Sequence, residues 1–204
     1  MNTSELLAIA QSPTIEWLES CFGPGTLWRP GPAALPAGLQ DKETRAFLTE
    51  TGIPAVQLHA LSYDSADLPE RGMWEADPDE LFGNRYPDDH SPPTRYSYCI
   101  GKLSQLHLMV SGNTGAVEIY NPDGWDHAAG YGGYAAPSVP EFIGALGLFT
   151  LYQQRFDDAD VSAAFAALDE FTTLLEQLGQ GPDESGFWED LLEEIREECE
   201  YRDD

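Results

Sequence analysis

The residue types that could do chemistry in this chain are its carboxylates, its histidines and its cysteines. The 204 residues include 36 Asp and Glu, so carboxylate pairs at the spacing used in glycoside hydrolysis arise by chance and carry little specificity. No GxSxG nucleophile elbow is present. The four histidines form no metal-ligand spacing with a cysteine or with one another: His59, His90, His107 and His127. The sequence therefore predicts no catalytic residues, no metal and no cofactor.

Two glycine-containing segments are the candidates for holding a small ligand. "GNTG" at 112–115 has neither the lysine of a phosphate-binding loop nor the glycine spacing of a dinucleotide fold, and it predicts a tight turn with positive φ at Asn113 and Gly115. "PDGWDHAAGYGGYAAP" at 122–137 predicts a surface loop rich in glycine and aromatics. A non-catalytic small-ligand or glycan-binding module that uses residues 124–134 is therefore one alternative.

Acidic charge dominates the chain and is concentrated in two segments. The net charge is −26; residues 157–204 hold 17 Asp and Glu against two Arg, and residues 64–82 hold seven against one. Such a field repels nucleic acid phosphates and anionic lipid, and it attracts basic partners from beyond contact range. The sequence predicts a basic protein partner, with no direct contact to nucleic acid or membrane. Solubility alone is the competing explanation.

The segment "GFWEDLLEEIREECEYRDD" at 186–204 predicts an amphipathic helix. One stripe is apolar and contains Trp188, Leu192, Ile195 and Cys199, whereas the opposite face is acidic. Acids four residues apart on a helix repel each other by about 0.2–0.5 kcal/mol per pair, and acids in the last turn oppose the helix dipole. Stability alone therefore does not account for these residues.

The remaining elements follow from caps, spacing and alternation. Residues 1–20 predict an N-terminal extension helix, and residues 64–95 an acidic, proline-rich excursion anchored by Met73, Trp74, Leu81 and Phe82. Helices are predicted at 12–23 with Ser12 as N-cap, at 41–52 with Asp41 as N-cap, at 138–156 and at 161–179. Strands are predicted at 55–63, 95–103, 106–111 and 116–121. Strands in the centre and helices at both ends indicate an α+β fold, with residues 1–204 as a single domain and 157–204 as its acidic helical part.

The cellular compartment follows from the cysteines and the N-terminus. Cys21, Cys99 and Cys199 are odd in number, widely spaced and set among apolar residues, which indicates reduced thiols. No apolar run approaches the roughly 18 residues of a membrane span. Glu5 lies where a signal peptide would carry basic residues. We therefore expect a cytoplasmic protein.

Several segments together resemble one family. They are "FGPGTLWRPGPAALPAGLQDKETRAFLTETGIP" at 22–54, "GNTGAVEIY" at 112–120, "SVPEFIGALGLF" at 138–149 and "ESGFWEDLLEEI" at 184–195. They resemble the SUKH superfamily of bacterial immunity proteins, most closely its SUKH-4 branch. The signature residues of that branch correspond here to Thr44, Arg45, Phe47, Leu48, Gly52, Ile53 and Pro54. Where the family often has Asn-Ser before the following helix, this chain has Ala136 and Pro137 and keeps only Ser138.

The resemblance implies a central antiparallel sheet flanked by N-terminal and C-terminal helices, without enzymatic activity. It also implies that the protein neutralises a cognate toxin, commonly a nuclease or nucleic acid deaminase, and such toxins tend to be basic. We expect the acids of the last helix and of residues 75–80, with aromatic anchors, to contact it. The alternative is that these acids only form a solvated face and that the partner docks on the sheet or on residues 64–95. The candidate toxin-binding residues are Glu189, Asp190, Glu193, Glu194, Glu197, Glu200, Trp74, Glu75, Asp77, Asp79, Glu80 and Trp125.

Overall fold

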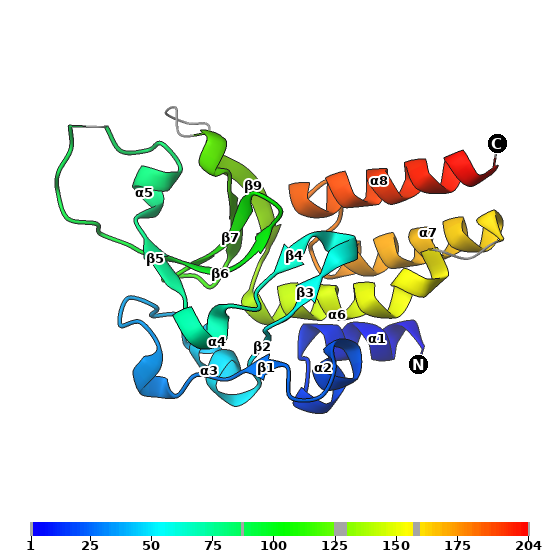
Figure 1. The fold of residues 1–204 in the computed structure, drawn as a ribbon, viewed down its shortest axis with the longest axis horizontal. Coiled ribbons are helices and arrows are strands. Elements are labelled where there is room, and N and C mark those ends of the chain that lie inside the picture. The colour runs from blue at the N-terminus through cyan, green and yellow to red at the C-terminus, as the bar shows by residue number, and fades with distance from the viewer. Residues whose placement is uncertain (1, 87, 125–129, 157–159, 204) are drawn as a thin grey trace.

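The computed structural model describes residues 2–86, 88–124, 130–156 and 160–203 and combines helices with an antiparallel sheet (Figure 1). The helices are α1 Thr3–Gln11, α2 Ile15–Phe22, α3 Lys42–Glu50, α4 Leu68–Arg71, α5 Pro78–Leu81, α6 Val139–Phe156, α7 Val161–Gln177 and α8 Gly186–Asp203. The strands are β1 Leu27–Trp28, β2 Ile53–Pro54, β3 Gln57–Leu58, β4 Tyr63–Asp64, β5 Trp74–Ala76, β6 Ser97–Leu103, β7 Leu106–Ser111, β8 Val117–Tyr120 and β9 Tyr131–Ala136. The predicted α+β class is confirmed.

The main sheet is an antiparallel meander extended at both sides. Its order is β3-β4-β6-β7-β8-β9, and β5 pairs with the same edge of β6 that β4 uses. The predicted strands at 95–103, 106–111 and 116–121 correspond to β6, β7 and β8. Gly115 in the β7–β8 turn has the expected positive φ of 74°, whereas Asn113 does not have a positive φ.

Three predicted elements differ from the structure. Residues 55–63 do not form one strand, because the two-residue β3 and β4 are separated by a 3-10 turn and by Ser62 in the left-handed region. The segment predicted as a loop at 122–137 contains β9, which pairs with β8. Residues 1–20 form parts of two helices rather than one, and α2 is capped by the Thr14 side chain instead of Ser12.

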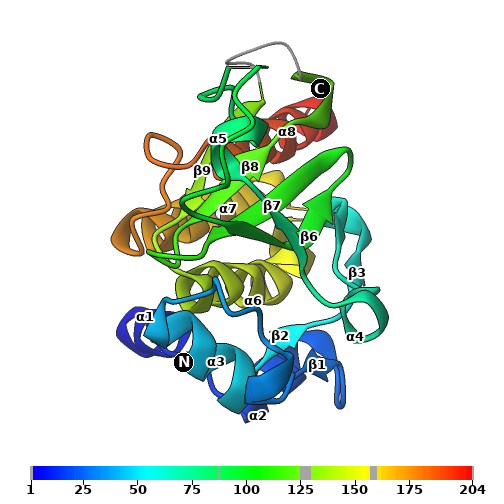
Figure 2. The same cartoon turned by 90° about the vertical axis from the view of Figure 1, so that its left-hand side faces the viewer.

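The helices α8, α7, α6 and α1 lie side by side in this order, and α8 and α6 contact β9 of the sheet. Figure 1 shows α8, α7, α6 and α1 in succession, and Figure 2 shows α1, α2 and α3 on the side of α6 away from the sheet. The N-terminal helices approach α6 at two glycines, since a Cβ at Gly144 would overlap the carbonyl oxygen of Ala10 and one at Gly147 would overlap the Trp17 ring. One contiguous hydrophobic core includes residues from α1, α6, α7, α8 and the sheet.

The segment 41–54 is fixed by its own polar contacts. The Asp41 carboxylate caps α3 by accepting the backbone N–H of Thr44 at 2.8 Å. Arg45 donates to the carbonyl oxygens of Pro36 and Leu39 at 3.0 and 2.9 Å and so holds the preceding proline-rich chain. Gly52 follows the helix with φ of 86°, where a Cβ would also lie 2.6 Å from the carbonyl oxygen of Trp28. These residues therefore help to build the scaffold.

Candidate protein-binding surface

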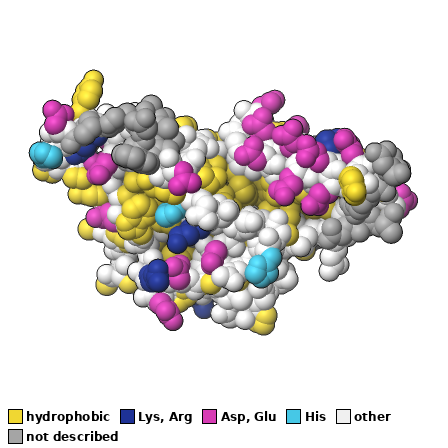
Figure 3. All heavy atoms as spheres, turned by 45° about the horizontal axis from the view of Figure 1, so that its top comes forward, with side chains coloured by type: hydrophobic (Ala, Val, Ile, Leu, Met, Phe, Trp, Pro, Cys, Tyr) yellow, Lys and Arg dark blue, Asp and Glu magenta, His cyan; other side chains and the backbone are white. Residues whose placement is uncertain are grey.

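One exposed surface is the acidic side of α8. Trp188, Leu192 and Cys199 are buried against the core, which places the acids on the solvent side. Figure 3 shows Asp and Glu side chains gathered over this helix. The α8 acidic face, as we define it, consists of Glu189, Asp190, Glu193, Glu194, Glu197 and Glu200, all exposed. Within the described residues, none of the six forms an ion pair or a side-chain hydrogen bond, so their charge is available to a partner.

The acids of β5 and α5 are less available. Asp77 is 8% exposed, forms an ion pair with Arg85 at 2.6 Å and caps α5 through the N–H of Asp79 at 3.0 Å. Asp79 is half-buried and forms an ion pair with Arg95. The exposed acids of this segment are Glu75, which accepts the Tyr98 hydroxyl at 3.0 Å, and Glu80. The remaining candidate, Trp125, lies outside the described residues.

A second surface is the sheet face turned away from α6, to which Trp74, one of the predicted contact residues, belongs. Register places Trp74, Cys99, Met109 and Glu118 side by side across β5, β6, β7 and β8. Three aromatic side chains meet there: the ring of Trp74 lies 5.6 Å from that of His107 and 6.5 Å from that of Tyr120, and the last two are 5.8 Å apart. Trp74 remains 46% exposed, although a tryptophan normally buries most of its surface. His107 and Tyr120 are opposite each other in the predicted hairpin of β7 and β8. The register of this hairpin could therefore have indicated part of the aromatic cluster from the sequence.

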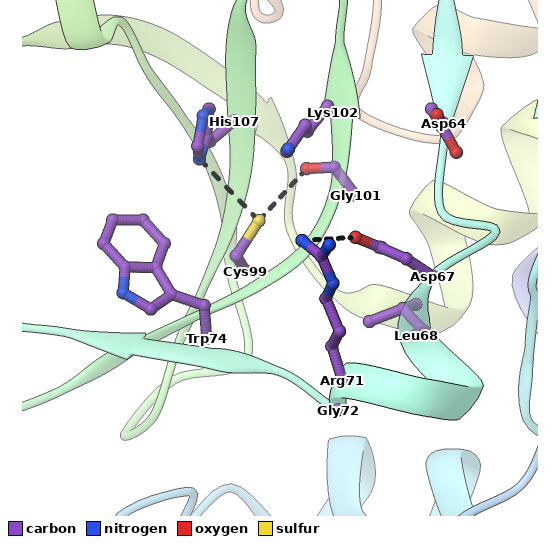
Figure 4. A pocket seen from close by; sticks show the side chains of 10 residues that line it. All are labelled: Asp64, Asp67, Leu68, Arg71, Gly72, Trp74, Cys99, Gly101, Lys102 and His107. Carbon is purple, nitrogen blue, oxygen red and sulfur yellow. Dashed lines mark hydrogen bonds and ion pairs between the residues drawn. The ribbon is translucent and has the colours of Figure 1, made fainter.

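A pocket of about 390 Å³ opens beside this aromatic cluster (Figure 4). Its floor contains the Cys99 thiol, which donates to the carbonyl oxygen of Gly101 at 3.3 Å and lies 4.0 Å from Nδ1 of His107. Burial raises the pKa of the Cys99 thiol, and burial lowers the pKa of the His107 imidazole. Both side chains are therefore uncharged at neutral pH. The pair lacks the thiolate that nucleophilic catalysis needs.

Glu118 is the ionisable side chain at the centre of this face. Burial raises its pKa, and the nearby Arg95 partly opposes the rise. Because the pKa is higher in the folded state than in the unfolded state, folding disfavours the charged form. The free energy of unfolding therefore decreases as the pH rises from the unfolded pKa through the folded one.

We expect carboxyl ¹³C NMR to give Glu118 a titration midpoint above the roughly 4.3 of an unperturbed glutamate, and Arg95→Gln to raise it further. A midpoint below that reference, or one that falls in Arg95→Gln, would contradict the burial described for this side chain. In Glu118→Gln this carboxyl group is absent, so the free energy of unfolding from denaturant titrations should decrease less with rising pH than in the wild type.

Neither a metal site nor a membrane span is found in the described part of the chain. No group of three or more His, Cys, Asp or Glu there could hold a metal ion. Likewise, no helix among those residues is long and apolar enough to cross a membrane.

Comparison with known proteins identifies a family for most of the chain. A sequence model described as SUKH-4 immunity protein matches residues 14–194 of the 204. No curated protein and no solved structure gives a significant match.

Proposed function

Because the chain belongs to the SUKH-4 immunity protein family, we propose that it protects a bacterial cell by binding and neutralising a cognate toxin domain through the α8 acidic face. The toxin is basic and acts on nucleic acid, as a nuclease or a deaminase. The observation that carries the proposal is the family match combined with the six exposed acids of the α8 acidic face. The protein acts in the cytoplasm, where such a toxin would reach its substrate.

Charge geometry supports this partner. A toxin that acts on nucleic acid needs a positively charged surface to bind the phosphates. The negative charge of the α8 acidic face complements such a surface. Electrostatic attraction of this kind raises association rates by about 10- to 10³-fold, and the effect is screened by salt. The acids repel one another on the free helix, and a cationic surface that covers them reduces this repulsion. Because the toxin binds only the folded protein, its binding also stabilises the fold by mass action.

The mechanism requires no bond to be made or broken by this chain. The protein covers the nucleic acid groove of the toxin and competes with its substrate. The uncharged Cys99 and His107 side chains are consistent with a binding role, because neither is prepared for nucleophilic attack. We also propose that residues 1–204 act as one domain, supported by the contiguous core that joins α1, the sheet and α8.

The decisive experiment is rescue by co-expression. The toxin domain encoded next to this gene is expressed from an inducible promoter, with and without this protein, and survival is counted. We expect survival to be restored with the cognate toxin and not with an unrelated nuclease toxin. If the protein gives no protection and purified material does not bind the toxin domain, the proposed function is wrong.

A further inference from the structure

The pocket beside Trp74 exists because two strands share one edge of β6. β4 pairs with Lys102 and Leu103 at one end of β6, and β5 pairs with residues from Ser97 to Cys99 at the other. Between these pairings the chain leaves the sheet and forms α4. The arch of residues 65–73 therefore frames an opening over the sheet face. We call the opening the sheet pocket; its lining includes Leu68, Trp74, Cys99 and His107.

The lining of the sheet pocket combines an apolar part, to which Leu68, Trp74 and Cys99 belong, with charged side chains. Leu68, the first residue of α4, is buried, and the Cys99 thiol is held by its hydrogen bond to the carbonyl oxygen of Gly101. The Trp74 ring packs edge to face against His107, and the residue remains 46% exposed at one side of the pocket (Figure 4). A preformed site of this size, with an exposed aromatic wall, lies within the about 300–1,000 Å³ typical of binding pockets.

The charges around the sheet pocket cancel. Lys102 and Arg71 lie on its rim, as do Asp64 and Asp67. Asp67 forms an ion pair with Arg71 at 3.5 Å, and Asp64 accepts hydrogen bonds from Gln57 and from the backbone N–H of Ala66. With two carboxylates and two cationic side chains among the lining residues, neither a cationic nor an anionic occupant meets a net opposite charge. In a chain of net charge −26, this is a locally neutral, apolar opening, and it favours an uncharged occupant.

From these features we infer that the sheet pocket receives an uncharged aromatic side chain of the toxin, which anchors the complex while the acidic surface attracts it. The inference rests on the proposed function for the identity of the partner. It assigns the two surfaces different tasks: the α8 acidic face governs the rate of encounter, and the sheet pocket governs the rate of dissociation. Aromatic side chains buried in such pockets are the residues that dominate interface energies.

The chemistry of the pocket can be tested without the toxin. Benzyl alcohol, benzylamine and benzoate share one ring and differ in charge, and each is titrated into ¹⁵N-labelled full-length protein. We expect benzyl alcohol to shift the amide signals of Gly101 and Lys102 and to bind several-fold more tightly there than either charged probe. Trp74→Ala should abolish these shifts, whereas Leu151→Ala should not, because Leu151 is similarly exposed at 41% but lies on α6.

Three outcomes would overturn the inference. They are tighter binding of either charged probe than of benzyl alcohol, no shift of these amide signals by any probe, and shifts that persist in Trp74→Ala. A thermal melt of each variant shows whether it is folded. Should Trp74→Ala be unfolded, Trp74→Gln, which keeps a long side chain but removes the aromatic wall, must give the same loss.

The toxin complex then separates this inference from the proposed function. For wild-type protein that rescues cells, we expect Trp74→Ala to weaken toxin binding at least about ten-fold, mainly through faster dissociation. An unchanged dissociation rate would remove the pocket from the interface and leave the immunity function intact. If wild-type protein does not bind the toxin, the proposed function is wrong, and so is the inference that the pocket anchors the toxin. The probe titration still shows which chemistry the pocket accepts.

Discussion

Reversing two charges on α8, Glu193→Lys with Glu197→Lys, is expected to lower the rate of association with the toxin by about ten-fold or more at low salt. The two residues lie one helical turn apart on the α8 acidic face, and the double variant changes the local charge by four units. Loss of folding does not explain such a result, because the new lysines have acidic neighbours on the same helix and lie towards its negative end. The melting temperature should be unchanged or slightly higher.

Stopped-flow association measured against ionic strength checks this expectation. The difference between wild type and variant should shrink towards 1 M salt, where the Debye length is about 3 Å. Glu43→Lys with Glu50→Lys provides a matched control, since both acids are exposed on α3, which Figure 1 places at the opposite side of the molecule from α8. Equal slowing by both double variants would show that only total charge matters and that α8 is not the contact surface.

Trp188→Ala is expected to lower the free energy of unfolding by about 3–5 kcal/mol, a large fraction of the stability of a typical domain. The Trp188 side chain is 0% exposed, and its ring packs 5.5 Å from that of Phe171 and 4.5 Å from that of Phe187. Its indole N–H donates to the Gln180 side chain at 3.2 Å, and Gln180 in turn donates to the carbonyl oxygen of Glu141 at 3.1 Å. Truncation leaves both a cavity and a buried amide oxygen without its donor.

Urea denaturation monitored by circular dichroism measures this loss. Trp188→Phe keeps most of the apolar volume but removes the donor to Gln180, so we expect it to lose about 1–3 kcal/mol. Trp74→Ala serves as the control for removing a tryptophan, because Trp74 is 46% exposed and should matter little for stability. A loss below about 1 kcal/mol in Trp188→Ala would mean that α8 contributes little to the core.

The helices that were predicted well carry their own local signals. Ser138 caps α6 and contacts Glu141 in capping-box spacing, and Gly179 ends the α7 region with a φ of 66°. Apolar residues in α6 recur at helical intervals and are buried, including Phe142, Leu146, Phe149, Tyr152 and Phe156. These features depend on neighbours a few residues apart, which is the range that periodicity and capping rules describe.

The elements that were missed depend on partners distant in the sequence. The glycines and tyrosines of β9 have the composition of a loop, and β8 makes them a strand by pairing. The alternation from Val56 to Ala60 resembles one strand, yet β4 folds back on β3 through Ser62. Sequence patterns do not contain the tertiary pairing that decides these cases.

The predicted binding residues were affected by distant partners in the same way, because ion pairs with arginines further along the chain are not visible in a local sequence pattern. Asp77 and Asp79 counted as surface acids in the sequence, but arginines 8 and 16 residues further on, Arg85 and Arg95, neutralise them in the fold. The acids of α8 were placed correctly because a helix with one apolar stripe fixes the direction of all its other side chains.

Gly52 and Arg45 hold the framework, and on α8 the Trp188 side chain is buried whereas Glu193 is exposed. If the toxin contacts the α8 acidic face as proposed, exchanging its outer side chains should change how strongly the protein attracts the toxin and leave the core intact. A library that randomises only those outward positions should yield folded proteins with altered surface charge, from which variants that attract other charged partners can be selected.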